Sequence, residues 1–161
     1  MLKSFIEREK EILGIIEAIN KSGLDYVLVG GYAVSAYKRR FSVDADVCID
    51  KKDLDSFKDL LKSRHFAMTK RRELEDAYKG GFECYVKKTK LPVTVDLMIG
   101  SIASRQTNAS ISFQSLFEHS ATKEIAGAEK SIEARIPSKE MLIALKIHAA
   151  RRTDARDIVA L

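Results

Sequence analysis

Residues 43–49 form the segment that most restricts how this chain can fold. Apolar side chains alternate there with acidic or polar ones, in the order Val43, Asp44, Ala45, Asp46, Val47, Cys48 and Ile49. Because side chains alternate between the two faces of a strand, the pattern predicts one wholly apolar face and one face that carries two carboxylates. We expect a central strand whose apolar face is buried.

Asp44 and Asp46 are two residues apart, so both carboxylates lie on the same side of the predicted strand. Two such charges repel each other, and their burial is costly unless a cation lies between them. Mg²⁺ takes hard oxygen ligands of this kind, one or two carboxylates together with substrate phosphates. The alternative is a solvent-exposed polar face, which the wholly apolar opposite face disfavours.

A second strand is predicted over residues 26–29, a short apolar run that ends at Gly30 and Gly31. A helix is predicted directly afterwards, over residues 32–38. The glycines would let the backbone approach a ligand closely, and the helix would offer free N–H groups to a phosphate. Taken alone, two glycines after a strand are more typical of a simple tight turn.

A third acidic position, Asp96, lies within the predicted strand 93–99, on the face opposite its apolar neighbours. A lone aspartate in a strand is more often a hydrogen-bonded structural residue. Together with Asp44 and Asp46, however, it would complete a set of three carboxylates from two adjacent strands. Such a set can hold two divalent ions that promote in-line phosphoryl displacement.

The remaining pattern alternates helices and strands. Further helices are predicted over 3–21, 53–64, 141–151 and 154–161, further strands over 66–70, 81–87 and 131–136, and a mobile loop over 100–110. Ser138 is the expected N-cap of the third of these helices. The fold class is therefore α/β or α+β with a mixed β-sheet flanked by helices. We expect one domain over residues 1–161, with a core of about 22–136 and short C-terminal helices over about 138–161.

Composition excludes several classes of protein. The chain has 161 residues, 45% of them hydrophobic, and no apolar run approaches the roughly 20 residues of a membrane span. Two cysteines are too few for a disulfide framework, and charged residues at the amino terminus do not fit a secretory signal. We therefore expect a cytoplasmic protein without a membrane partner. A net charge of +5 would suit a polyanionic ligand without identifying one.

Together, Gly30-Gly31, the pair Asp44 and Asp46, and Asp96 resemble the pattern of the nucleotidyltransferase superfamily that includes DNA polymerase beta. Arg40 and Ser42 ahead of the acidic pair are similar to the abortive-infection-type (AbiEii-like) nucleotidyltransferase toxins. The tail is also similar to that group, in which a helix lysine is followed by an arginine and two acids. The resemblance covers residues 27–47, 93–98 and 139–161.

The resemblance implies a minimal nucleotidyltransferase fold with a short C-terminal helical segment. It implies magnesium-dependent transfer of a nucleoside monophosphate from an NTP such as ATP to a hydroxyl, with release of pyrophosphate. Asp44, Asp46 and Asp96 would be the catalytic residues and the ligands of two Mg²⁺ ions. The implied nucleotide-binding residues are Gly30, Gly31, Ser35, Arg40 and Lys146. Tyr32 stands where the family often has a small serine, so Ser35 would supply that hydroxyl.

The implied acceptor is RNA, such as tRNA, or a protein, and a cognate antitoxin and a homodimer are further expected partners. Two alternatives stay open. One is an aminoglycoside-type enzyme that modifies a small molecule. The other is a nucleotide-binding, antitoxin-like module with little catalysis.

Other polar residues favour simpler roles. His148 fits a structural position on an amphipathic helix, and Cys48 fits a small buried thiol. Basic residues at 70–72 and 87–90 could follow an RNA backbone. A solvated strand face is the favoured interpretation of these residues, because no aromatic residues are interleaved with them.

Overall fold

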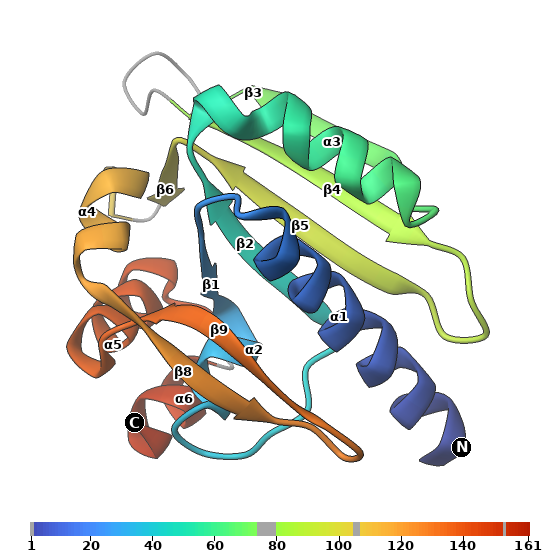
Figure 1. Ribbon diagram of the computed structural model, residues 1–161. Coiled ribbons are helices and arrows are strands. Elements are labelled where there is room, and N and C mark those ends of the chain that lie inside the picture. The colour runs from blue at the N-terminus through green and yellow to red at the C-terminus, as the bar shows by residue number, and fades with distance from the viewer. Residues whose placement is uncertain (1, 74–79, 105–106, 153) are drawn as a thin grey trace.

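A five-stranded mixed sheet forms the centre of the protein, seen here in a computed structural model that describes residues 2–73, 80–104, 107–152 and 154–161 (Figure 1). Its strands, in spatial order, are β1 (Tyr26–Val29), β2 (Asp44–Ile49), β5 (Val93–Ile99), β4 (Gly81–Lys87) and β3 (Ala67–Glu73). Strands β2 and β5 are parallel, and the other neighbours are antiparallel. The mixed α+β class predicted from the sequence is confirmed.

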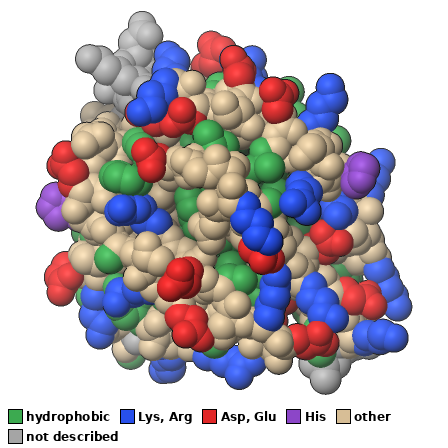
Figure 2. Space-filling model, viewed as in Figure 1, with side chains coloured by type: hydrophobic (Ala, Val, Ile, Leu, Met, Phe, Trp, Pro, Cys, Tyr) green, Lys and Arg blue, Asp and Glu red, His purple; other side chains and the backbone are tan. Residues whose placement is uncertain are grey.

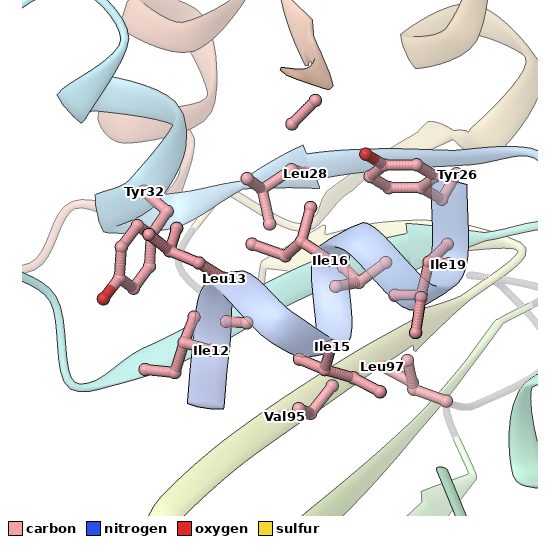
Figure 3. Packing of buried hydrophobic residues seen from close by; sticks show 14 of the residues in the cluster. Ile12, Leu13, Ile15, Ile16, Ile19, Tyr26, Leu28, Tyr32, Val95 and Leu97 are labelled. Carbon is pink, nitrogen blue, oxygen red and sulfur yellow. The ribbon is translucent and has the colours of Figure 1, made fainter. Parts of the chain in front are cut away.

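Two helices cover one face of this sheet. They are α1 (Leu2–Ser22) and α3 (Leu54–Ser63), the latter preceded by the short 3-10 helix η1 (Lys51–Asp53). Ile15 and Ile16 of α1 are buried, and in Figure 3 Ile15 lies beside Val95 and Leu97 of β5 while Ile16 points toward Leu28 of β1. Every second side chain of β5 is buried, as the alternation in the sequence requires.

The surface on the side of α1 and α3 has an even distribution of charge. Figure 2 shows Lys and Arg side chains interspersed with Asp and Glu across this side, without a large region of one sign. Several of these charges pair locally, for example Lys130 with Glu17 at 2.8 Å and Lys10 with Glu129 at 2.6 Å. This side is an ordinary solvated surface.

The opposite face of the sheet is covered only at the end formed by β1 and β2. A second apolar cluster joins Val27, Val29 and Cys48 to side chains of α4 (Phe113–Glu118) and α5 (Lys139–Ala149). The side chains of β4 and β5 that point to the same face are half-buried, Phe82, Cys84, Val86, Thr94, Asp96 and Met98. The sheet is therefore closed on one side and partly open on the other.

Smaller elements complete the chain. The hairpin of β8 (Ser120–Ala126) and β9 (Ser131–Pro137) contacts β1 through β9, and α6 (Asp154–Ala160) packs against α5. Helix α5 begins at the predicted cap, since the Ser138 hydroxyl accepts a hydrogen bond from the Met141 amide at 3.2 Å. No helix among the described residues has the length and apolar character needed to cross a membrane.

Three expectations about local structure were wrong or incomplete. Residues 100–110 are not a loop throughout, because β6 (Ser101–Ser104) pairs with β7 (Ala109–Ser112). Strand β8 was not predicted at all. The helix expected over 32–38 is α2 (Gly30–Ser35), which begins at the glycines themselves. The polar connection before β4 includes residues 74–79, which lie outside the described residues, as does Thr153, one of two caps expected for the last helix.

Candidate active site

The register of the sheet brings the two strand motifs together. Asp46 on β2 lies opposite Asp96 on β5, and on its other side Asp46 lies opposite Val29, the last residue of β1. Asp44 lies one step along the same face. The three acids predicted as a set therefore occupy one face of two neighbouring strands, directly beside the turn from β1 into α2.

Gly30 and Gly31 allow the backbone to pack closely against Asp46 and Ser42. Gly30 has φ +67, and a Cβ at this position would collide with the Asp46 carboxylate. A Cβ at Gly31 would collide with the Ser42 hydroxyl and lie against the Arg40 guanidinium. Glycine is therefore required at both positions by close approach, and at Gly30 also by backbone conformation. Helix α2 has only six residues, so the need for glycine follows from these close contacts and not from the N-terminus of the helix.

The two serines near this turn differ in what they contact. The Ser42 hydroxyl donates a hydrogen bond to Asp44 at 3.0 Å and adjoins Gly31. The Ser35 hydroxyl instead donates to the Tyr32 carbonyl at 2.7 Å and is buried within α2. Ser42 is thus the hydroxyl that lies beside the acids, whereas Ser35 is held away from them.

Burial and mutual repulsion perturb the acids. Burial, together with the charges of Asp44 and Asp96, raises the pKa of Asp46 to about 7. Burial also raises the pKa of Asp96, and a hydrogen bond from Cys84 and, to a smaller extent, the positive charge of Lys70 on β3 partly offset this rise. One oxygen of Asp96 is buried and has no hydrogen-bond partner among the described residues. Such a cluster disfavours its own charge and would be stabilised by a cation.

The C-terminal helices place cations on the other side of the turn. Lys146 on α5 is 5% exposed and pairs with Asp154 at 3.0 Å and Asp157 at 2.7 Å. Arg40 also pairs with Asp157, so it joins the segment before β2 to α6. Burial raises the pKa of Asp154, but hydrogen bonds from Lys146 and the Arg151 amide outweigh this effect, and the pKa lies below its usual value.

A cavity of about 220 Å³ opens between these parts. Its polar lining includes Asp46, Asp96, Lys146 and His148, and its apolar lining includes Phe82, Met98, Ile102, Leu142 and Leu145. His148 is 8% exposed, and its Nδ1 lies 2.8 Å from the Thr107 hydroxyl. Its Nε2 is buried without a hydrogen-bond partner. The cavity therefore carries two buried polar atoms, on Asp96 and His148, that a bound group could satisfy.

The acids do not by themselves form a complete metal cage. Among the described residues, no three His, Cys, Asp or Glu side chains converge closely enough to hold an ion. Mg²⁺ does not need such a cage, because it is commonly bound by one or two carboxylates plus substrate phosphates. The unpartnered Asp96 oxygen and the raised pKa of Asp46 fit a site completed by a metal-nucleotide complex.

The fold is shared with solved nucleotidyltransferase structures. A protein from Thermotoga maritima, assigned as a nucleotidyltransferase, matches with TM-score 0.64 and 11% identity over 93% of this chain and 89% of its own. The lincosamide antibiotic adenylyltransferase LnuA, solved with lincomycin bound, matches with TM-score 0.60 and 19% identity over 94% of each chain. The antibiotic-resistance factor ANT(2'')-Ia matches with TM-score 0.59 and 11% identity over 99% of this chain and 83% of its own.

These identities establish the fold alone. The chain has the minimal nucleotidyltransferase architecture, a mixed sheet flanked by helices, which the sequence predicted. No family model and no curated protein matches the sequence. Similarity to the AbiEii-like toxins therefore remains a prediction from the motifs.

Two further residues of this region were named from the sequence without being assigned a role in the site. Ser42 precedes the acidic pair by two positions, and this spacing was the available signal, although the hydroxyl was assigned to Ser35. His148 lies two residues after Lys146 on α5 and was expected to be structural. Its position in the cavity depends on how α5 packs across the sheet, so no local pattern could have revealed it.

Proposed function

We propose that this protein is a magnesium-dependent nucleotidyltransferase that moves a nucleoside monophosphate from an NTP to a hydroxyl acceptor and releases pyrophosphate. The observation that carries the proposal is the alignment of Asp44, Asp46 and Asp96 on one face of β2 and β5, beside the turn at Gly30, which lines the same cavity as Asp46 and Asp96. The shared fold is consistent with this chemistry without specifying it.

Each part of the site has a role in this proposal. The triphosphate would lie against the backbone of Gly30 and Gly31, which the absent side chains allow to approach Asp46 and Ser42 closely. Lys146 and Arg40 would stabilise its negative charge. In the structure both cations pair with Asp157, so nucleotide binding would require them to share or exchange this partner.

Asp44 and Asp46 would hold Mg²⁺ with the phosphates, and Asp96 would complete the set. The ions supply charge neutralisation on the phosphates and activation of the attacking oxygen. Asp96, whose pKa is raised by burial, would orient the acceptor hydroxyl and accept its proton. The bond from the α-phosphorus to the acceptor oxygen forms as the bond to pyrophosphate breaks.

A second candidate acceptor is a small molecule. The fold likeness to LnuA, described as a lincosamide antibiotic adenylyltransferase, favours testing it. The cavity of about 220 Å³ is below the roughly 300–1,000 Å³ of pockets that enclose drug-sized ligands. We therefore place RNA or protein first as the acceptor, with an antibiotic as the alternative.

The test is transfer of label from each α-labelled NTP, with Mg²⁺, to total RNA, to proteins of a lysate, and to lincomycin or an aminoglycoside. We expect Asp44→Ala or Asp46→Ala to reduce transfer at least a thousandfold, because each removes a group that acts only with the others. The readout is labelled product separated from free nucleotide.

Asp59→Asn is the matched control, since Asp59 is an exposed acid on α3, on the other face of the sheet. It should transfer label at the wild-type rate. Full activity in a folded Asp44→Ala, Asp46→Ala double variant would refute the proposal. NTP binding without transfer to any acceptor would support a nucleotide-binding module in its place.

A further inference from the structure

The open face of the sheet continues from the acids to its outer edge. Asp46 lies opposite Asp96, Asp96 opposite Cys84, and Cys84 opposite Lys70 on β3. The neighbouring row runs from Met98 through Phe82 to Arg72. Residues paired across a sheet share a face, so Lys70 and Arg72 lie on the same face as the acids.

These two cations differ from the others that the sequence grouped with them. Arg71 points to the opposite face, where it pairs with the buried Glu83 at 3.6 Å and with Glu73 at 3.2 Å. Lys87 pairs with Glu11 of α1 at 2.7 Å. Among the residues that the structure describes, neither Lys70 nor Arg72 has an ion-pair partner. Residues 70–72 are therefore divided between the two faces of the sheet, with Lys70 and Arg72 on the face of the acids.

The cavity beside Asp96 limits how much of an acceptor can enter. A volume of about 220 Å³ takes one small group, and the rest of a longer acceptor must lie outside it. The adjacent surface is the half-buried face of β5 and β4, bordered by β3, all of whose residues are exposed. An acceptor that leaves the cavity along this face meets Lys70 and Arg72.

We propose that Lys70, Arg72 and the open face of β4 and β5 form the docking surface for a single-stranded RNA whose terminal ribose enters the cavity. This assignment of the acceptor rests on the proposed function. Residues two apart on a strand are separated by roughly 7 Å, which suits contacts with successive phosphates of an extended strand. Cationic grooves of this kind bind nucleic acid through the backbone without reading its sequence.

RNA fits the surroundings better than an acidic peptide. Phe82 and Met98 line the cavity next to the two basic positions and offer apolar contact to a base. A terminal ribose has neighbouring hydroxyls, one for transfer at Asp96 and one that can bond to the unpartnered Nε2 of His148. A peptide would offer a single hydroxyl and no flat ring beside it.

The test measures binding of a fluorescein-labelled 12-nucleotide RNA to the full chain by anisotropy, without NTP or Mg²⁺, at ~50 and ~200 mM salt. The variant is Lys70→Gln with Arg72→Gln. Removing two phosphate contacts should lower the slope of log K against log salt by about 1.4, so that the affinity ratio between the two salt conditions falls about sevenfold. Circular dichroism checks that the variant is folded.

The matched control is Lys62→Gln with Arg64→Gln, which removes one lysine and one arginine from exposed positions at the end of α3. It should bind RNA with the wild-type affinity and salt slope. Equal losses in both double variants, an unchanged slope in the first, or stronger competition by polyglutamate than by unlabelled RNA would overturn the inference. Because binding is measured without catalysis, RNA binding that depends on Lys70 and Arg72 would stand even if nucleotidyl transfer were absent.

Discussion

At the scale of single residues, the acids of the site destabilise the protein that contains them. Asp46 has a pKa of about 7, against an ordinary value of 3.8, so the folded state holds its proton more tightly than the unfolded state does. Stability from this group is therefore greatest at low pH and declines as the pH rises from about 4 to about 7. This pH dependence of stability has the opposite sign to that of a carboxylate held in an ion pair.

We predict that Asp46→Asn stabilises the metal-free protein above pH 7 by about 2 to 4 kcal/mol, because the amide carries no charge to bury. Urea unfolding at pH 5 and pH 8 measures this. The gain should be smaller at pH 5 than at pH 8, and the gain at pH 8 should shrink when Mg²⁺ and nucleotide are added to the wild type. Equal stability of the two proteins at pH 8 would show that the buried charge of Asp46 does not destabilise the protein.

His148 provides a second prediction at this scale. Replacing it with Ala removes the buried Nε2, and loss of one hydrogen bond to the acceptor should lower kcat/KM for RNA about threefold to tenfold. The Michaelis constant for NTP should change little. His148→Gln can restore a polar group near the Nε2 position and should recover part of the loss. If His148 had a structural role alone, its replacement would lower the melting temperature without affecting kcat/KM for RNA and the Michaelis constant for NTP differently.

At the scale of elements, α5 and α6 are joined by buried charges. Lys146 lies between Asp154 and Asp157, so its removal leaves two buried carboxylates without their shared cation. We predict that Lys146→Ala lowers the free energy of unfolding at pH 7 by about 3 kcal/mol. Lys139→Ala, an exposed lysine on the same helix, is the control and should change it by less than about 0.5 kcal/mol.

This loss has a defined pH dependence. The pKa of Asp154 lies below its usual value, so the stability it contributes is present above its unfolded pKa and disappears as the pH falls through the folded pKa. The difference between Lys146→Ala and the wild type should therefore narrow in strong acid. A difference that stays constant down to pH 2 would mean that packing, and not charge, accounts for it.

Element patterns also explain which parts of the fold could be predicted. Strand β5 alternates strictly between buried and half-buried side chains, and β2 does so from Asp44 to Val47, so both strands and the face that carries the acids could be predicted. Strand β8 has one buried residue, Ile125, and six that are not, so its sequence carries no clear period. It forms a strand by pairing with β9, the next segment of the chain, and its own sequence does not show this pairing.

The candidate site also has a part that could be predicted from the sequence and a part that could not. The acids and glycines lie on locally patterned segments and were named in advance. The contacts of Arg40 with Asp157 span 117 residues, and the place of His148 depends on the docking of α5. The hairpin of β6 and β7 was mistaken for a loop because each strand has only four residues, two of them serine. The contact of Arg40 and the place of His148 depend on long-range packing, which no local period encodes.

At the scale of the whole molecule, the sheet separates two environments. The face under α1 and α3 holds the main core, including Ile12, Phe57 and Leu97, all fully buried. The other face is filled only over β1 and β2, which leaves β5 and β4 accessible beside the acids. The closed side can provide stability while the open side keeps the polar groups that chemistry requires.

Arg40 pairs with Asp157 of the last helix, so the candidate site is complete only after that helix has been made. During synthesis, the strands that carry Asp44, Asp46 and Asp96 leave the ribosome before α5 and α6. The acids therefore meet no Lys146, and the cavity has no wall, until the later segment emerges and docks. A nascent chain would thus remain inert toward nucleotide while its sheet is already assembled, so activity would begin only after the last helices have been made.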